Sequence, residues 1–155
     1  MSRRIAFKRG RYVLALDDRE RELIRRLLGE LRGLLALDAG DPRVRRLYPA
    51  AYADDAEKED EYRRLTHEEL KQSRLANIDL VEGSVEARVL DAEQLTAWMQ
   101  AVNSLRLILG TMLGITEDDQ ELPFDPEDPD AQTQALYAYL GGLLDEIVDA
   151  QLETF

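Results

Sequence analysis

Apolar and polar residues alternate in two stretches near the start of the chain, residues 4–8 and 11–16. The apolar positions of these two stretches are Ile5, Phe7, Tyr12, Leu14 and Leu16. Arg9 and Gly10 join the stretches, and a two-residue connection containing glycine is typical of a hairpin, although Arg-Gly is a weaker turn signal than Asn-Gly. The pattern predicts a β-hairpin within residues 3–16.

The apolar spacing changes from two residues to three and four after Asp17. The residues that follow the helical period are Leu23, Ile24, Leu27, Leu28, Leu31, Leu34 and Leu35. Asp17 and Glu20 have the spacing of a capping box, in which each side chain binds the backbone N–H of the other residue. A run of turn-forming residues, 38–42, follows the stripe. We therefore predict an amphipathic helix that begins after Asp17.

The chain from residue 43 to residue 65 is less regular and predicts a short helical turn followed by an ordered loop. Residues 54–61 concentrate acidic side chains within this segment. Thr66 and Glu69 have the spacing of a second capping box. This spacing predicts a helix that begins at Thr66 and ends near Val81.

Alternating valine and alanine positions predict a short third strand within Val85–Val89. Asp91 and Gln94 then have the spacing of a third capping box. The helix that follows, residues 92–113, is apolar on nearly every side, which is typical of a helix at the centre of a bundle. Gly114 is placed to end that helix.

The last helix is predicted to follow the acidic, proline-containing segment 116–130. Asp128 suits its cap and Pro129 its first residue. We therefore predict a mainly α fold, with four principal helices around a central apolar helix, a small N-terminal β-hairpin and a third short strand. No change in composition divides the chain, so we predict a single domain over 1–155, with the hairpin at 3–16 and a helical body at 17–155.

Charge is distributed unevenly along the 155 residues, whose net charge is −12. Residues 1–48 hold 13 Lys and Arg against 7 Asp and Glu, a net +6, and residues 49–155 hold 7 against 25, a net −18. Attraction between the two parts within the fold explains this pattern without any partner, and we favour that interpretation. The functional alternatives are a basic face for an acidic partner and an acidic face for a basic one.

The composition, 45% hydrophobic and 34% charged, is that of a folded protein. The chain has no cysteine, which excludes disulfides and thiolate chemistry and fits a cytoplasmic location. No apolar stretch approaches the roughly 20 residues that span a bilayer, so we expect no membrane partner. Lys8, Arg9 and Arg11 interrupt the apolar part that a signal peptide would need.

The familiar catalytic motifs are missing from the sequence, including phosphate-binding loops and the Gly-x-Ser-x-Gly elbow. His67 is the only histidine, and one histidine does not build a typical zinc site. The acidic segments 54–61 and 116–130 lack the spacing and the turn glycine of a calcium loop. We therefore predict no catalytic residue, no metal site and no cofactor.

Polar residues inside the apolar helix form the sharper candidate site. Asn103 and Arg106 lie three residues apart and so project to the same side, and a guanidinium within a packed bundle needs a partner. The cluster that we predict, as a binding site or a structural one, is Trp98, Asn103 and Arg106 with Tyr48, Tyr52, Asp54 and Asp55. We favour a structural role, in which Arg106 ties the irregular loop to the central helix. The alternative is a pocket for an anion or a peptide terminus.

A candidate basic face consists of Arg4, Lys8, Arg9 and Arg11. These side chains would supply contacts to phosphates in a nucleic-acid-binding protein. The rest of the chain is strongly acidic and contains no convincing helix-turn-helix pair, so a nucleic-acid partner is disfavoured.

Several segments resemble an actinobacterial family that is known as a domain of unknown function. They are Leu47–Asp55, Glu61–Arg63, Leu90–Gln94, Ala97–Thr111 and Gly114–Thr116. Genes of this family commonly lie beside the gene for the ClpS adaptor, with a metalloprotease and a sulfur-carrier cysteine-synthesis cluster often nearby. The resemblance implies no catalytic residues, and it implies an accessory role in ClpS-dependent proteolysis or sulfur-carrier metabolism.

The leading hypothesis is a non-enzymatic protein-interaction or regulatory accessory module whose partner is another protein. The first alternative is a small-molecule-binding protein or enzyme with a polar pocket around Arg106. The second is a nucleic-acid-binding regulator that uses the basic hairpin. The sequence leaves the oligomeric state open.

Overall fold

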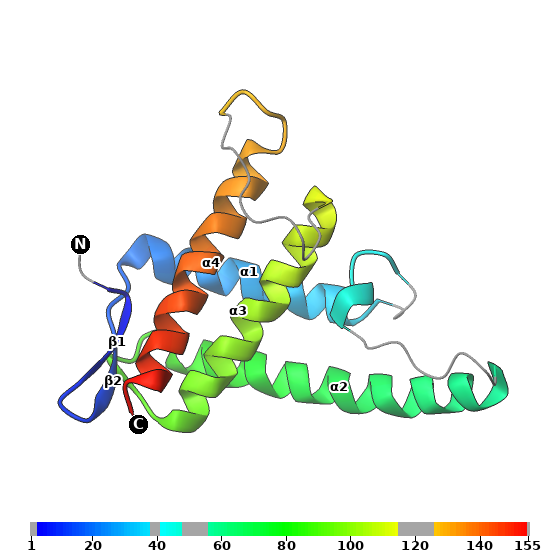
Figure 1. The fold of residues 1–155 in the computed structure, drawn as a ribbon, viewed down its shortest axis with the longest axis horizontal. Helices are drawn as coiled ribbons and strands as arrows, with labels where there is room; N and C mark the ends of the chain where they lie inside the picture. The colour runs from blue at the N-terminus through cyan, green and yellow to red at the C-terminus, as the bar shows by residue number, and fades with distance from the viewer. Residues whose placement is uncertain (1–2, 38–40, 48–55, 115–125, 155) are drawn as a thin grey trace.

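Four long helices and a small antiparallel sheet make up the protein in the computed structural model (Figure 1). The structure describes residues 3–37, 41–47, 56–114 and 126–154. In chain order the elements are β1 (Ile5–Lys8), β2 (Arg11–Leu14), α1 (Asp18–Leu35), the 3-10 turn η1 (Arg45–Leu47), α2 (Ala56–Ser84), β3 (Val89–Leu90), α3 (Ala92–Leu113) and α4 (Ala131–Leu152). The predicted fold class, mainly α with an N-terminal hairpin and a third strand, is confirmed.

The hairpin forms around Arg9 and Gly10, as the alternation predicted. Both residues have positive φ, 52° and 77°, which is the conformation that a two-residue hairpin turn with the right twist requires. Strand β3 pairs antiparallel with β2, with Tyr12 opposite Leu90, so the sheet order is β1-β2-β3. The third strand is shorter than predicted and begins only at Val89.

Helix α1 begins with the predicted capping box. The Asp17 side chain accepts a hydrogen bond from the Glu20 backbone N–H at 2.8 Å, and Glu20 Oε1 accepts from the Asp17 N–H at 3.4 Å. The leucine stripe is buried as its spacing predicted, at Ile24, Leu27, Leu28, Leu31 and Leu35.

Helix α2 begins at Ala56, so the prediction that it starts with a cap at Thr66 is wrong. Thr66 lies inside the helix. Residues 56–65, which precede it, contain Ala, Glu, Lys and Arg, which are strong helix formers, and no glycine or proline. Part of the expected loop is therefore helical. The first half of α2 extends beyond the other helices (Figure 1), and the buried positions Ile78 and Val81 lie in its second half.

Helix α3 occupies the centre, as its apolar composition predicted. It packs against α2 and α4 and also touches α1 and η1. Trp98 is completely buried, and its indole N–H donates to Ser84 Oγ of α2 at 2.8 Å. Gly114 ends α3 in the left-handed conformation, with φ of 72°.

Helix α4 begins at Ala131, so the prediction that Pro129 is its first residue is wrong. Asp128 caps a turn before the helix, because its Oδ1 accepts from the backbone N–H of Asp130 at 2.8 Å. The buried face of α4 includes Leu143 and Ile147 and lies on α3 and β1. Among the described helices, none is long and apolar enough to cross a membrane.

Replacing Ser84 by alanine is expected to destabilise the protein by about 1–3 kcal/mol, because the indole N–H of Trp98 would stay buried without its acceptor. Trp98 is the only tryptophan, so its fluorescence during urea unfolding reports the change. Ser73→Ala makes the same chemical change at an exposed position of α2. It should shift the free energy of unfolding by less than about 0.5 kcal/mol. Equal effects of the two substitutions would contradict a role for this hydrogen bond.

Candidate functional site

The predicted polar cluster lies only partly within the described residues. Tyr48, Tyr52, Asp54 and Asp55 fall outside them, so their pairing with Arg106 stays a prediction. The three residues from α3 have different environments. Trp98 is buried against α2, Asn103 is exposed, and Arg106 is half-buried against α4. The structure does not bring Trp98 and Arg106 to one site, because their polar groups contact different helices.

Arg106 joins α3 to α4 through Tyr137. Its Nη2 donates to the Tyr137 hydroxyl at 3.2 Å, and its guanidinium carbon lies 4.8 Å from the centre of the tyrosine ring. The guanidinium lies against Gly141 of α4, where an added Cβ would sit at ordinary contact distance, 3.5 Å from Arg106 Nε. That Nε is buried and donates to no acceptor among the described residues.

A second guanidinium approaches the same ring from η1. A Cβ placed on Gly110 of α3 would lie 3.4 Å from Arg46 Nη1 and 3.5 Å from Tyr137 Cε2. Arg46 and Arg106 therefore both lie near Tyr137, in a part of the fold where α3, α4 and η1 meet.

The four residues of the predicted basic face are divided by the structure. Arg4 is partly buried and bound by acidic side chains, since its Nε donates to Glu20 and its Nη1 lies 3.7 Å from Glu146 Oε2. Lys8, Arg9 and Arg11 are exposed around the hairpin turn. Within the described ranges these three side chains have no acidic partner.

Glu20 and Tyr139 complete the environment of Arg4. The Tyr139 hydroxyl donates to Glu20 Oε2 at 2.8 Å, and the Arg4 guanidinium carbon lies 4.8 Å from the centre of the Tyr139 ring. Burial raises the pKa of Tyr139 well above its usual value, and the hydrogen bond to Glu20 raises it further. The hydrogen bond with Glu20 likewise raises the pKa of Arg4.

The arginines of α1 separate into two groups. Three of them pair with acidic residues at the C-terminal end of α2 and just beyond it. Arg32 Nη2 lies 2.9 Å from Asp79 Oδ1 and 3.2 Å from Glu82 Oε1. Arg21 and Arg25 both contact Glu86, and the hydrogen bond from Arg25 lowers the pKa of that carboxyl. These pairs support the interpretation that the basic and acidic parts attract one another within the fold.

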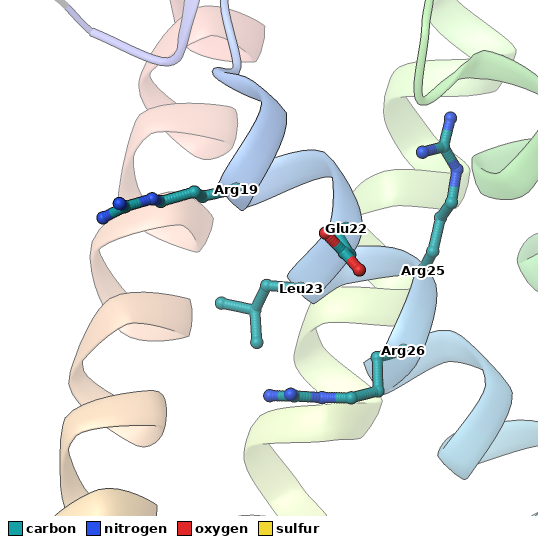
Figure 2. A pocket seen from close by; sticks show the side chains of 5 residues that line it. All are labelled: Arg19, Glu22, Leu23, Arg25 and Arg26. Carbon is teal, nitrogen blue, oxygen red and sulfur yellow. The ribbon is translucent and has the colours of Figure 1, made fainter.

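Arg19 and Arg26 form the other group and have no acidic partner among the described residues. Figure 2 shows that both extend toward the α4 side of α1 with Leu23 between them, whereas Arg25 points away. A hollow of about 590 Å³ opens here. Its lining residues are Arg19, Glu22, Leu23, Arg25 and Arg26. The sequence analysis did not single out these residues, although positions 19, 23 and 26 share one helical face.

A second hollow, of about 550 Å³, continues from the first toward α4 and shares Leu23 and Arg26 with it. Its other lining residues are Leu27, Glu30, Gln132, Ala135, Leu136 and Tyr139. The first hollow is lined by α1 alone and the second by both helices, and we call the two adjoining hollows the α1–α4 groove. Side chains such as Tyr139 bridge α1 and α4 across it, whereas the main backbone packing of α4 is against α3 and β1.

The α1–α4 groove combines two kinds of side chain. Its guanidinium groups have the geometry to accept carboxylates as partners, and its leucines offer apolar contact. In the part of the chain that the structure describes, no group of three or more His, Asp or Glu side chains is placed to hold a metal ion.

Replacing Tyr139 by phenylalanine is expected to lower the free energy of unfolding by about 1.5–3 kcal/mol at neutral pH, because the hydroxyl donates to a charged carboxylate. The folded-state pKa of Tyr139 is raised, so its contribution is complete below the usual pKa of 10.0 and is lost as the pH rises above it. The difference between the native protein and Tyr139→Phe should therefore shrink above pH 10.0.

Urea unfolding at a series of pH values measures this difference. Tyr12→Phe is the control, because among the described residues the Tyr12 hydroxyl bonds only the neutral Thr154 Oγ1, at 3.1 Å on the surface. A Tyr139→Phe effect that grows with pH would be inconsistent with the raised pKa.

Comparison with known proteins finds one matching family. No curated protein and no solved structure matches the chain. The model of one family, described as Domain of unknown function (DUF2017), matches residues 2–151. That match covers nearly the whole chain and confirms the resemblance to a domain-of-unknown-function family. The protein therefore belongs to the DUF2017 family.

Proposed function

We propose that the protein is a non-enzymatic interaction module that binds an acidic region of another protein through its basic N-terminal third. One observation carries this proposal. Five basic side chains of this region lack an acidic partner among the described residues: Lys8, Arg9, Arg11, Arg19 and Arg26. They lie at the hairpin turn and on the α4 side of α1.

Because the chain has many more acidic than basic side chains, a basic side chain without an acidic partner is unexpected. With 32 Asp and Glu against 20 Lys and Arg, acidic partners are plentiful. The fold pairs Arg4, Arg21, Arg25 and Arg32 with them. The charge pattern therefore has two explanations, one for each set of basic residues. The paired arginines attract acidic residues inside the fold, and the five unpaired side chains form the proposed binding surface.

A protein partner fits this surface better than a nucleic acid does. Leu23 and Leu136 offer apolar contact within the α1–α4 groove, and Glu22 and Glu30 line it too. A uniform phosphate backbone would be repelled by these carboxylates, and by the net charge of −12. A protein segment can place acidic and apolar side chains selectively.

The genes that commonly lie beside members of the resembled family suggest which partners to test first. Members are commonly encoded beside the ClpS adaptor and near a sulfur-carrier cluster. We therefore propose a cytoplasmic accessory role in regulated proteolysis or sulfur-carrier metabolism, with ClpS and the sulfur carrier as candidate partners.

A second candidate function is binding of a small anion beside Arg106. It is supported by the buried Arg106 Nε, which lacks an acceptor among the described residues, and by the neighbouring Arg46. If the site binds anions, sulfate or phosphate should raise the melting temperature of the native protein more than that of Arg106→Met. Equal shifts in the two proteins would reject this candidate.

Charge reversal tests the interaction function. Affinity capture from cells, and direct binding to purified ClpS and sulfur carrier, should identify a partner of the native protein. Reversal at four sites, with Arg9, Arg11, Arg19 and Arg26 each changed to Glu, should weaken the binding of that partner at least about tenfold, since each lost contact is a charge pair.

The control reverses Arg64 and Arg88, two exposed basic residues outside the basic N-terminal third. It should bind as the native protein does, and circular dichroism should show that both variants are folded. The absence of any reproducible partner would contradict the proposal, and so would a partner that binds the four-site variant with native affinity.

A further inference from the structure

We infer that the α1–α4 groove binds an acidic amphipathic helix of the partner, with Arg19 and Arg26 as its two charged contacts and Leu23 as its apolar one. The inference rests on the proposed function and assigns the partner's chemistry and its place on the fold.

The spacing of Arg19 and Arg26 sets the spacing of the two carboxylates that a partner would need. Arg19 and Arg26 are seven residues apart, which is about two helical turns and about 10 Å along the axis of α1. Figure 2 shows both side chains extending in the same direction, with Leu23 between them. A partner helix with two carboxylates seven residues apart, and an apolar residue midway, repeats this pattern in complementary form.

The shape and lining of the α1–α4 groove favour a helix over an extended peptide. The first hollow is lined by α1 alone and the second by α1 and α4. The backbone groups of these helices are bonded within each helix, so an extended peptide would find no strand edge with which to pair. A helix satisfies its own backbone and needs only side-chain contacts. The two hollows, of about 590 and 550 Å³, adjoin one another and present the part-buried Leu23 and Leu136 to such a helix.

Acidic residues in the same groove make the site selective. Glu22 lies between the two arginines in the sequence, and Glu30 follows one turn after Arg26. A partner with carboxylates at every position would be repelled by them, whereas carboxylates at the two arginine positions alone are attracted. The groove therefore discriminates against a general polyanion.

A synthetic peptide of defined spacing tests the site. The probe is a fluorescein-labelled, side-chain-stapled helix with two Glu residues seven apart, a Leu midway and Ala or Gln elsewhere. Its binding to the full-length protein is measured by fluorescence anisotropy at low salt. We expect Arg19→Glu with Arg26→Glu to weaken this binding at least about tenfold.

Two matched controls define the specificity of the result. Arg64→Glu with Arg88→Glu makes the same change in charge at exposed positions outside the basic N-terminal third and should leave the affinity within about threefold. A probe with Lys in place of Glu should bind the Arg19→Glu, Arg26→Glu variant better than it binds the native protein. Circular dichroism of each variant shows whether it is folded.

Several results would overturn the inference. They are failure of the probe to bind at low salt, equal binding of a probe whose Glu residues are four apart, and equal loss of binding in the Arg19→Glu, Arg26→Glu variant and the Arg64→Glu, Arg88→Glu variant. Concentration-dependent dimerisation by sedimentation that is lost in the groove variant would assign the groove to a second copy instead. A cellular partner whose binding is lost when Arg9 and Arg11 are changed to Glu, and kept when Arg19 and Arg26 are changed, would overturn the groove assignment and leave the interaction function standing.

Discussion

The carboxylate of Glu20 connects three parts of the protein that are far apart in the sequence. One of its oxygens accepts the backbone N–H of Asp17 and so completes the cap of α1. The other accepts from Arg4, which precedes β1, and from Tyr139 of α4 at 2.8 Å. Because the same group takes part in the helix cap and in both long-range contacts, the start of α1 is fixed to the hairpin and to α4 together.

The form of the α1–α4 groove depends on this junction. Tyr139 lines the groove and also binds Glu20, so the contact that joins α1 to α4 is part of the wall of the candidate site. Arg4 is held within the junction and is therefore separated from the exposed basic residues of the hairpin turn. The opposite side of α1 is attached to α2 by Arg21, Arg25 and Arg32. With α2 attached to the opposite side, Arg19 and Arg26 are left on the α4 side of α1, where Arg26 and Tyr139 line the same hollow.

Local signals predicted the elements that depend on local interactions. The capping boxes at Asp17 and Asp91 join residues three apart, and the hairpin pairs residues at most nine apart, from Lys8 with Arg11 to Ile5 with Leu14; the structure confirms both. The starts of α2 and α4 were placed wrongly, because Thr66 and Asp128 have residue types that suit a cap but also occur inside a helix or in a turn. Strong helix formers before Thr66 let α2 begin at Ala56, ten residues earlier than predicted.

The candidate site was less predictable, because its contacts join distant residues. The spacing of Asn103 and Arg106 indicated a polar position in α3. Nothing local indicated that Tyr137, which lies 31 residues further along the chain, would bind Arg106. The shared face of Arg19, Leu23 and Arg26 can be read from the sequence. Their lack of acidic partners cannot, since it depends on where α2 and α4 place their carboxylates.

The projecting half of α2 has a consequence for local stability. No described side chain between Glu61 and Asn77 is buried, and Leu65 remains 64% exposed. The hydrogen bonds of the projecting part are therefore supported mainly by helix propensity and by pairs such as Gln72 with Glu68 at 3.1 Å. Near the end of this stretch, Leu75 packs against the core and Arg74 Nη2 donates to the Leu47 carbonyl at 2.8 Å. The amides of the projecting part should exchange with solvent through local fraying, while those near Ile78 open only when the core unfolds. One continuous helix thus contains two regions that open differently. The free energy of opening the projecting half is set by local helix stability, and that of the second half by the stability of the core.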